Sequence, residues 1–203
     1  MIAIIDYGVG NLFSLRCSFG AIGEEAVVTG DRDVIRRADK IILPGVGAFG
    51  DAAEKLRLTG LGETVIEEAR RGKGVVGICL GMQLLFRRSF EYGEHAGLGL
   101  LDGEVVGMKG LLPDHLKIPH IGWNALRFHK ESRLISRIRE NDCVYFVHSF
   151  FARGCEDALV ATAEYGLAIP AVVQKENVMG CQFHPEKSGE TGLAILKSFC
   201  GGD

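Results

Sequence analysis

The first half of the chain alternates short hydrophobic runs with longer stretches of mixed polarity. The runs are rich in Val and Ile, as is typical of strands buried on both faces, and the stretches between them carry apolar residues at helical spacing. We expect strands at 2–5, 25–28, 40–45 and 74–78, and helices at 11–22, 50–57 and 61–72 with a short polar helix after residue 28. This alternation predicts a parallel sheet covered on both faces.

The second half is richer in strands. Hydrophobic runs predict strands at 103–108, 123–128, 143–150, 158–165, 169–174 and 178–183, followed by a closing helix over 189–200. No linker, low-complexity tract or internal repeat divides the chain. We therefore expect one domain over residues 1–203, of the α/β class, with a doubly wound, mostly parallel sheet and antiparallel additions late in the chain.

Composition and charge exclude several classes of protein. Hydrophobic residues make up 47% and charged residues 24% of the 203 residues, which is ordinary for a folded domain. With 23 basic and 26 acidic residues the net charge is −3, so we expect no binding to nucleic acid or to an anionic membrane. No hydrophobic run is long enough to span a bilayer, and the N-terminal MIAIIDYG does not resemble a signal peptide. These features predict a cytoplasmic protein.

The cysteines and histidines form no disulfide or metal pattern. The six cysteines, at positions 17, 79, 143, 155, 181 and 200, include no C-x-x-C pair, so we expect reduced thiols. The six histidines include no H-E-x-x-H, and the spacing of His115 and His120 fits neither a helix face nor a zinc finger. We expect no metal and no other cofactor.

The stretch GVVGICLGMQLLF, residues 74–86, predicts a reactive cysteine. A buried strand ends at Cys79, which lies between Gly77 and Gly81, and a helical pattern opens at Gly81. This is the G-x-S-x-G arrangement of a nucleophile elbow with sulfur in place of oxygen, in which glycines permit a tight, strained turn. The alternative is a buried cysteine that serves only as a small hydrophobic residue.

A general base for this cysteine is predicted in the segment HPEKSGE that follows the strand at 178–183. If the backbone at Pro185 is extended, His184 and Glu186 project to the same side, where the carboxylate can orient the imidazole. The alternative is an exposed strand end with two solvated side chains. Together with Cys79, the two residues predict a Cys-His-Glu triad.

An oxyanion hole is predicted in LPGVGAFGD, residues 43–51. Gly45 and Gly47 flank Val46, and glycines let backbone N–H groups turn toward a bound carbonyl oxygen. The amide of Leu80, next to the nucleophile, is the natural second donor. The alternatives are a phosphate-binding loop or a plain turn, although no Gly-Lys-Ser/Thr follows as in a Walker loop.

The motifs GICLGMQLLF and QFHPEKSG resemble those of the class I (triad) glutamine amidotransferases. The stretches IDYGVGNLFSL, ILPGVGAFGDA, GLGLLDGEVV, IPHIGWNAL and YFVHSF make the chain similar over nearly its whole length to one branch of that family, the glutaminase subunits of imidazole glycerol phosphate synthase. Two positions depart from the common pattern, Phe150 in place of tyrosine and Ile121 in place of methionine, and neither lies in the triad.

The resemblance implies an activity and a site. Cys79, His184 and Glu186 match the nucleophile, base and orienting residue, and glutamine would be hydrolysed to glutamate and ammonia through a thioester. The glutamine-binding positions of the family fall on the oxyanion loop (Gly45, Val46 and Gly47), on Gln83, and on His148 and Ser149. Without the family pattern, Gln83 would be interpreted as a helix-surface residue and His148 as a residue that fills space at a strand end.

The resemblance also implies a partner, a (β/α)8 cyclase that consumes the ammonia in histidine biosynthesis. The candidates for that interface are Asn11 in GVGN and His120, Trp123 and Asn124 in HIGWN. Trp123, the only tryptophan, is equally well interpreted as a core aromatic residue at a strand start. The glycine-rich oxyanion loop suggests that the isolated chain is nearly inactive until the partner is loaded.

Three rival interpretations remain at this stage. The chain could be a triad glutaminase that serves another acceptor, such as carbamoyl phosphate or anthranilate synthesis. It could be a docking subunit that has lost its chemistry, or a redox-sensing thiol protein built on a similar elbow. Intact Cys79, His184 and Glu186 argue against the docking subunit, and Glu186 has no role in a redox sensor.

Overall fold

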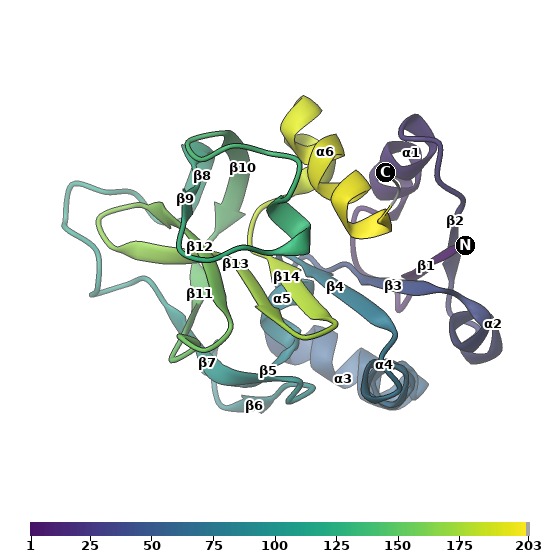
Figure 1. Ribbon diagram of the computed structural model, residues 1–203. Coiled ribbons are helices and arrows are strands. Elements are labelled where there is room, and N and C mark those ends of the chain that lie inside the picture. The colour runs from purple at the N-terminus through teal and green to yellow at the C-terminus, as the bar shows by residue number, and fades with distance from the viewer. Residues whose placement is uncertain (202–203) are drawn as a thin grey trace.

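A mixed eight-stranded sheet runs through the middle of the computed structural model, which describes residues 1–201 (Figure 1). In spatial order its strands are β2 (Ala26–Thr29), β1 (Ile2–Ile5), β3 (Lys40–Leu43), β4 (Gly74–Ile78), β14 (Val178–Cys181), β13 (Ala168–Lys175), β12 (Leu159–Glu164) and β9 (Arg127–Phe128). Strands β2 to β14 in this order pair in parallel, and β13, β12 and β9 are added antiparallel. The predicted doubly wound α/β class, with late antiparallel additions, is confirmed.

Helices cover both faces of this sheet (Figure 1). They are α1 (Leu12–Ala21), α2 (Arg32–Arg37), α3 (Phe49–Thr59), α4 (Leu61–Arg70), α5 (Leu80–Leu84) and α6 (Gly189–Cys200). One buried cluster includes Phe19 of α1 and Phe199 of α6, and a second includes Leu56 of α3 and Val65 of α4. The sheet therefore separates two hydrophobic cores. This agrees with strands such as β1 and β4, in which consecutive residues are buried because both faces of the sheet are covered. Within residues 1–201, no helix has the length and apolar character needed to cross a membrane.

Two smaller sheets lie beside the antiparallel end. Strand β10 (Cys143–His148) pairs with β8 (His120–Ala125). The other sheet has the order β11 (Phe150–Arg153), β7 (Leu101–Gly107), β5 (Phe86–Ser89) and β6 (His95–Ala96). Two short 3-10 helices, η1 (Arg133–Ile135) and η2 (Pro185–Lys187), complete the assignment.

Two strands predicted as continuous are each divided between two sheets. The run 123–128 is interrupted at Leu126, so that its first part belongs to β8 and its end forms β9. The run 143–150 is interrupted at Ser149, where the chain leaves β10 and enters β11. Neither run contains a glycine or a proline that would mark a break, so the pattern alone does not mark the change of sheet.

The apolar stretch after the predicted elbow is shorter as a helix than its sequence suggests. Helix α5 ends at Leu84, and Phe86 begins β5, which pairs with β7 and which the sequence did not predict. The apolar residues 84–86 fit the end of a buried helix and the start of a buried strand equally well, and pairing with a distant strand decides the outcome here.

Candidate active site

Cys79 lies in a strained turn between strand β4 and helix α5. Its backbone has φ 54° and ψ −112°, which is rare for a residue with a side chain. A Cβ on Gly77 would lie 2.5 Å from the carbonyl oxygen of Gly81, and a Cβ on Gly81 would lie 1.8 Å from that of Leu43. Glycine is therefore required on both sides of Cys79, as the elbow motif predicts, although the helix opens at Leu80, one residue before the predicted start.

His184 and Glu186 are paired at the end of strand β14. The Nδ1 atom of His184 lies 2.8 Å from Oε1 of Glu186, and their side chains are 4% and 1% exposed. The alternative of two solvated side chains at a strand end is therefore wrong. The predicted extended backbone is also wrong beyond His184, since Pro185 opens the 3-10 helix η2. Proline suits the first position of a helix because no N–H is needed there.

The backbone of this segment is held against strand β10. The N–H of His184 donates to the carbonyl of Tyr145 at 2.9 Å. Ser188 is fully buried, and its Oγ donates to the carbonyl of His184 at 2.6 Å and accepts from the N–H of Tyr145 at 3.0 Å. The imidazole is therefore positioned by its own backbone as well as by Glu186.

The electrostatic environment keeps His184 protonated at neutral pH. Burial by itself lowers the pKa of His184, but hydrogen bonds with Cys79 and Glu186, together with the charges of these groups, raise it to about 9. Among residues 1–201, the other oxygen of Glu186, Oε2, is buried without a hydrogen-bond partner, so the ring of His184 stabilises this buried carboxylate. Such an arrangement suits a histidine that donates and then recovers a proton.

Cys79 and His184 face a common cavity of about 370 Å³. The oxyanion candidates Val46, Gly47 and Leu80 line it, and so do the substrate candidates Gln83, His148 and Ser149. Gly45 does not line it, because it packs beneath the elbow, where a Cβ would lie 2.8 Å from the N atom of Gly81. Segments that are far apart in the sequence thus bring the predicted catalytic, oxyanion and substrate residues, except Gly45 and Glu186, to one cavity.

Gln83 is held by two hydrogen bonds that consume its amide hydrogens. Its Nε2 donates to the carbonyl of Phe150 at 3.0 Å and to Oε1 of Gln182 at 2.9 Å. Gln83 is 4% exposed, so the interpretation as a helix-surface residue is wrong. Its Oε1 is the atom left to accept a hydrogen bond from a ligand in the cavity.

Of the four predicted interface residues, His120 does not lie on the surface, so its assignment to an interface is wrong. It is only 2% exposed, and its Nδ1 lies 3.0 Å from Nε2 of His148, so its side chain belongs to the interior. Burial lowers the pKa of His120 to about 4 and that of His148 to about 3. Trp123 is 57% exposed, which rules out the core alternative, while Asn11 and Asn124 are partly exposed.

Gln182 and Glu91 are among the site residues that the sequence did not predict. Gln182 is fully buried, and its Nε2 lies 3.8 Å from Sγ of Cys79. Since it precedes His184 by two positions in an extended segment, the period of two could have placed it beside the triad. Glu91 lines the cavity and accepts the N–H of Phe49 through Oε2 at 2.7 Å. Burial raises the pKa of Glu91, and no motif marks this loop position in the sequence.

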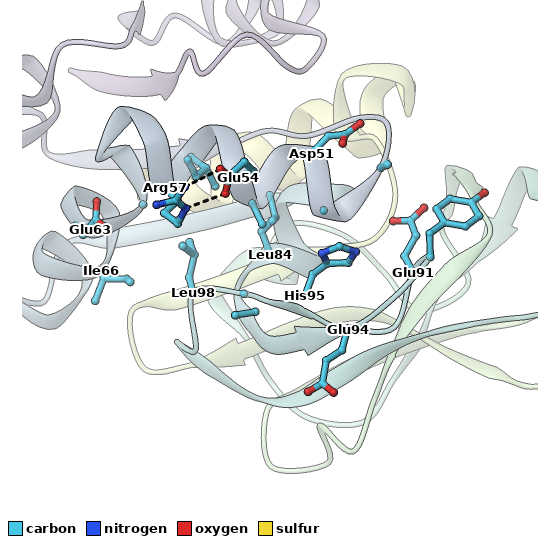
Figure 2. Close-up of a pocket in the computed structure, with 18 residues that line it drawn as sticks. Asp51, Glu54, Arg57, Glu63, Ile66, Leu84, Glu91, Glu94, His95 and Leu98 are labelled. Atoms are coloured by element: carbon cyan, nitrogen blue, oxygen red, sulfur yellow. Dashed lines mark hydrogen bonds and ion pairs between the residues drawn. The ribbon is translucent and has the colours of Figure 1, made fainter.

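A larger cavity, of about 710 Å³, lies next to this one (Figure 2). It is formed by α3, α4 and the segment 91–98, and it shares Glu91 and Tyr92 with the triad cavity. Figure 2 shows Arg57 paired with Glu54 on its wall, with His95 and Glu94 projecting from the facing segment. No triad residue lines it. Among residues 1–201, no group of three or more His, Cys, Asp or Glu side chains is arranged to hold a metal ion.

Comparison with known proteins gives one consistent answer. The family model described as glutamine amidotransferase class-I matches residues 3–201. The chain is 51% identical over 200 residues to the imidazole glycerol phosphate synthase subunit HisH of Caldanaerobacter subterraneus subsp. tengcongensis, covering 98% of this chain and 97% of that protein. It is 47% identical over 198 residues to the HisH subunit of Aquifex aeolicus, covering 97% and 94%.

Solved structures share the fold at lower identity. A glutamine amidotransferase crystal structure superimposes with a TM-score of 0.76 at 18% identity, covering 98% of this chain and all of that one. A structure of PurLQS from Thermotoga maritima gives 0.76 at 21% identity, covering 98% and 97%. The fold is thus that of the glutamine amidotransferases, and with the sequence matches it shows that the chain belongs to the class I glutamine amidotransferases, in the family of HisH subunits of imidazole glycerol phosphate synthase.

Proposed function

We propose that this chain hydrolyses L-glutamine to glutamate and ammonia through a Cys79-His184-Glu186 triad. One observation carries the proposal. In a single cavity, a cysteine on a strained elbow faces a histidine that interacts with it and is paired at 2.8 Å with a buried carboxylate. This is the arrangement that activates a nucleophile for acyl transfer.

In the first half of the reaction, Cys79 becomes acylated. Its thiolate sulfur forms a bond to the side-chain carbonyl carbon of glutamine, and the oxygen takes up the negative charge. We assign the donors for this oxyanion to the backbone N–H groups of Val46 or Gly47 and of Leu80, which line the cavity beside Cys79. His184 gives its proton to the nitrogen, the C–N bond breaks, and ammonia leaves a γ-glutamyl thioester.

In the second half, water replaces the sulfur. Neutral His184 takes a proton from water as the oxygen bonds to the thioester carbon. The C–S bond then breaks, which releases glutamate and restores the thiolate beside protonated His184. Glu186 orients the imidazole and stabilises the imidazolium, a role that its direct bond to Nδ1 at 2.8 Å supports.

We assign the α-ammonium group of glutamine to the acidic side of the cavity. Glu91 supplies a carboxylate there, and the free Oε1 of Gln83 supplies a second acceptor. Ser149 and His148 line the cavity at the β10–β11 connection, where His148 Nδ1 and Gln83 Nε2 bond to the same carbonyl oxygen, that of Phe150. Gly45 does not contact the substrate in this assignment. It packs so closely against Gly81 that a Cβ would lie 2.8 Å from the Gly81 N atom, and this close packing holds the oxyanion loop against the elbow.

We further propose that the ammonia passes to a (β/α)8 cyclase subunit, which makes imidazole glycerol phosphate and aminoimidazole carboxamide ribotide. The relatives named above are subunits of imidazole glycerol phosphate synthase, and a subunit requires a partner. Ile121 and Trp123, each 57% exposed, project from strand β8 and offer an apolar contact area, with Asn124 beside them and Asn11 as a further candidate. The six free thiols are compatible with a cytoplasmic location.

The test is glutamate release by the purified chain, alone and with a candidate cyclase plus its nucleotide ligand. We expect a low rate that rises sharply in the complete mixture. Cys79→Ala should abolish it, whereas Cys17→Ser, which changes an exposed thiol, should not. Rapid turnover by the isolated chain, with no response to the cyclase, would remove the partner but keep the glutaminase. No glutamate under any condition would overturn the proposed function.

A further inference from the structure

A chain of hydrogen bonds joins strand β8 to the wall of the triad cavity. Asn124 Nδ2 lies 3.5 Å from Nε2 of His120, His120 Nδ1 lies 3.0 Å from Nε2 of His148, and His148 Nδ1 lies 2.9 Å from the carbonyl oxygen of Phe150. His120 and His148 lie directly opposite each other in the antiparallel pair β8–β10. The proposed mechanism assigns no task to His120.

The carbonyl end fixes the protonation of both rings. A carbonyl oxygen only accepts, so Nδ1 of His148 carries a hydrogen. In a neutral ring Nε2 of His148 is then an acceptor, and the hydrogen between the two rings belongs to Nδ1 of His120. It follows that Nε2 of His120 is also an acceptor.

The amide end leads independently to the same assignment. Asn124 Nδ2 donates to the carbonyl of Glu164 at 2.8 Å, and Asn124 Oδ1 accepts the N–H of Ala125 at 2.8 Å. The amide therefore presents N–H, and not oxygen, toward Nε2 of His120. Both ends thus require the same direction of donation along the whole chain, with each ring neutral and protonated on Nδ1.

The ring of His120 is also held flat from both sides. It stacks on Phe146 at a centroid distance of 4.8 Å and on Tyr165 at 4.0 Å, with interplanar angles of 20° and 21°. Stacking fixes the plane of the ring, and the two hydrogen bonds fix its rotation. Within the described part of the chain neither ring has a carboxylate partner, and burial lowers the pKa of both, in agreement with neutral rings.

The far end of the chain reaches the glutamine pocket. The carbonyl of Phe150 accepts from His148 and from Nε2 of Gln83 together. We propose that His120 is a positioning residue for glutamine binding: through His148 it fixes the Phe150 carbonyl, and thereby the amide of Gln83, in a neutral chain protonated on both Nδ1 atoms. This inference rests on the proposed glutaminase function, because Gln83 is assigned there to the substrate.

The protonation pattern is tested on the unmodified chain by 15N NMR with labelled histidine at pH 7. We expect both His120 and His148 to show a protonated Nδ1 and an unprotonated Nε2, with the signals assigned from the variants His120→Phe and His148→Asn. A ring protonated on Nε2, or a doubly protonated ring, at either position would overturn the proposal. This measurement needs no enzymatic activity.

The positioning role is tested with His120→Phe, which keeps a flat ring between Phe146 and Tyr165 but donates nothing to His148. We expect the KM for glutamine to rise about tenfold with kcat within about twofold, as for the loss of one buried hydrogen bond that orients a substrate-binding group. The exposed residue His115 gives the matched control, His115→Phe, which should leave both constants unchanged.

The outcomes of the two tests separate this proposal from the proposed function. An unchanged KM in a folded His120→Phe variant, or an equal fall in kcat and kcat/KM, would overturn the positioning role. If the unmodified chain releases no glutamate even in the complete mixture with the cyclase and its nucleotide ligand, the proposed function fails and the positioning role fails with it. The tautomers observed by NMR would still establish or refute the directed chain.

Discussion

Two buried histidines line the same cavity but differ in charge, since His184 is protonated at neutral pH and His148 is neutral. His184 is 3% exposed and His148 is 6% exposed, so water is excluded from both to a similar degree. Yet the pKa of His184 is raised to about 9, while that of His148 is lowered to about 3. Burial acts in the same direction at both sites, because it disfavours the charged ring.

The difference comes from the partners. His184 has the thiol of Cys79 on one side and the carboxylate of Glu186 on the other, and both stabilise the imidazolium. His148 has a backbone carbonyl on one side and another histidine on the other, and the charge of a protonated His120 or His184 would oppose its own protonation. Burial therefore does not identify a catalytic histidine, whereas an acidic partner at hydrogen-bond distance does.

The largest effect is expected from removing the charged histidine. In His184→Gln the general acid and base is lost, and kcat for glutamine hydrolysis should fall by about 10³- to 10⁴-fold. The rate of glutamate release at saturating glutamine measures this. The control is His129→Gln, which changes a histidine that contacts Thr162 outside the cavity. A loss of less than tenfold in His184→Gln would mean that the two sites do not differ in chemistry.

The next largest loss of activity is expected from replacing Glu186, the charged partner of His184, by a neutral residue. Glu186→Gln keeps an oxygen that can accept from Nδ1, but it removes the negative charge that stabilises the imidazolium. The pKa of His184 should fall below about 9, and kcat should fall by about 10²-fold. An NMR titration of His184 gives the pKa. If this pKa were unchanged while activity fell, Glu186 would act by geometry and not by charge.

The triad could be predicted from the sequence because its signals are local. Gly77 and Gly81 are required because a Cβ at either position would collide with backbone atoms. The turn therefore leaves a local glycine pattern around Cys79 in the sequence. The pair His184 and Glu186 is only two positions apart, and a bond between them does not depend on the rest of the fold. Even the wrong expectation of an extended backbone did not affect this pairing.

The buried position of His120 could not be predicted. It depends on the register between β8 and β10, and on a strand whose polar residue faces the interior while its large apolar residues face solvent. Along β8, Ile121 and Trp123 are the exposed residues, whereas His120 is buried. The usual rule of apolar residues inside and polar residues outside therefore predicts the opposite orientation. The partner of His120 lies 28 positions away and is fixed only by the pairing of β8 with β10. Glu91 was missed for a similar reason, since it reaches the cavity from a loop with no motif.

The smallest effect, in the pH dependence of stability, separates the two sites by sign. His120 and His148 are neutral when folded, so protons bind to them only in the unfolded chain as the pH falls below about 6.5. Their stabilisation is complete above that pH and is lost as the pH falls toward 4. His184, with its raised pKa, contributes in the opposite sense: its stabilisation is complete below about 6.5 and is lost as the pH rises through about 9.

The stability difference can be measured on His120. Between pH 7 and pH 5, His120 and His148 should each lower the free energy of unfolding by about 2 kcal/mol. Urea unfolding at the two pH values should therefore show that His120→Phe loses about 2 kcal/mol less than the unmodified chain, because one of the two titrating rings is gone. An equal loss in both proteins would mean that His120 is already charged in the folded state, and the contrast between the two sites would then disappear.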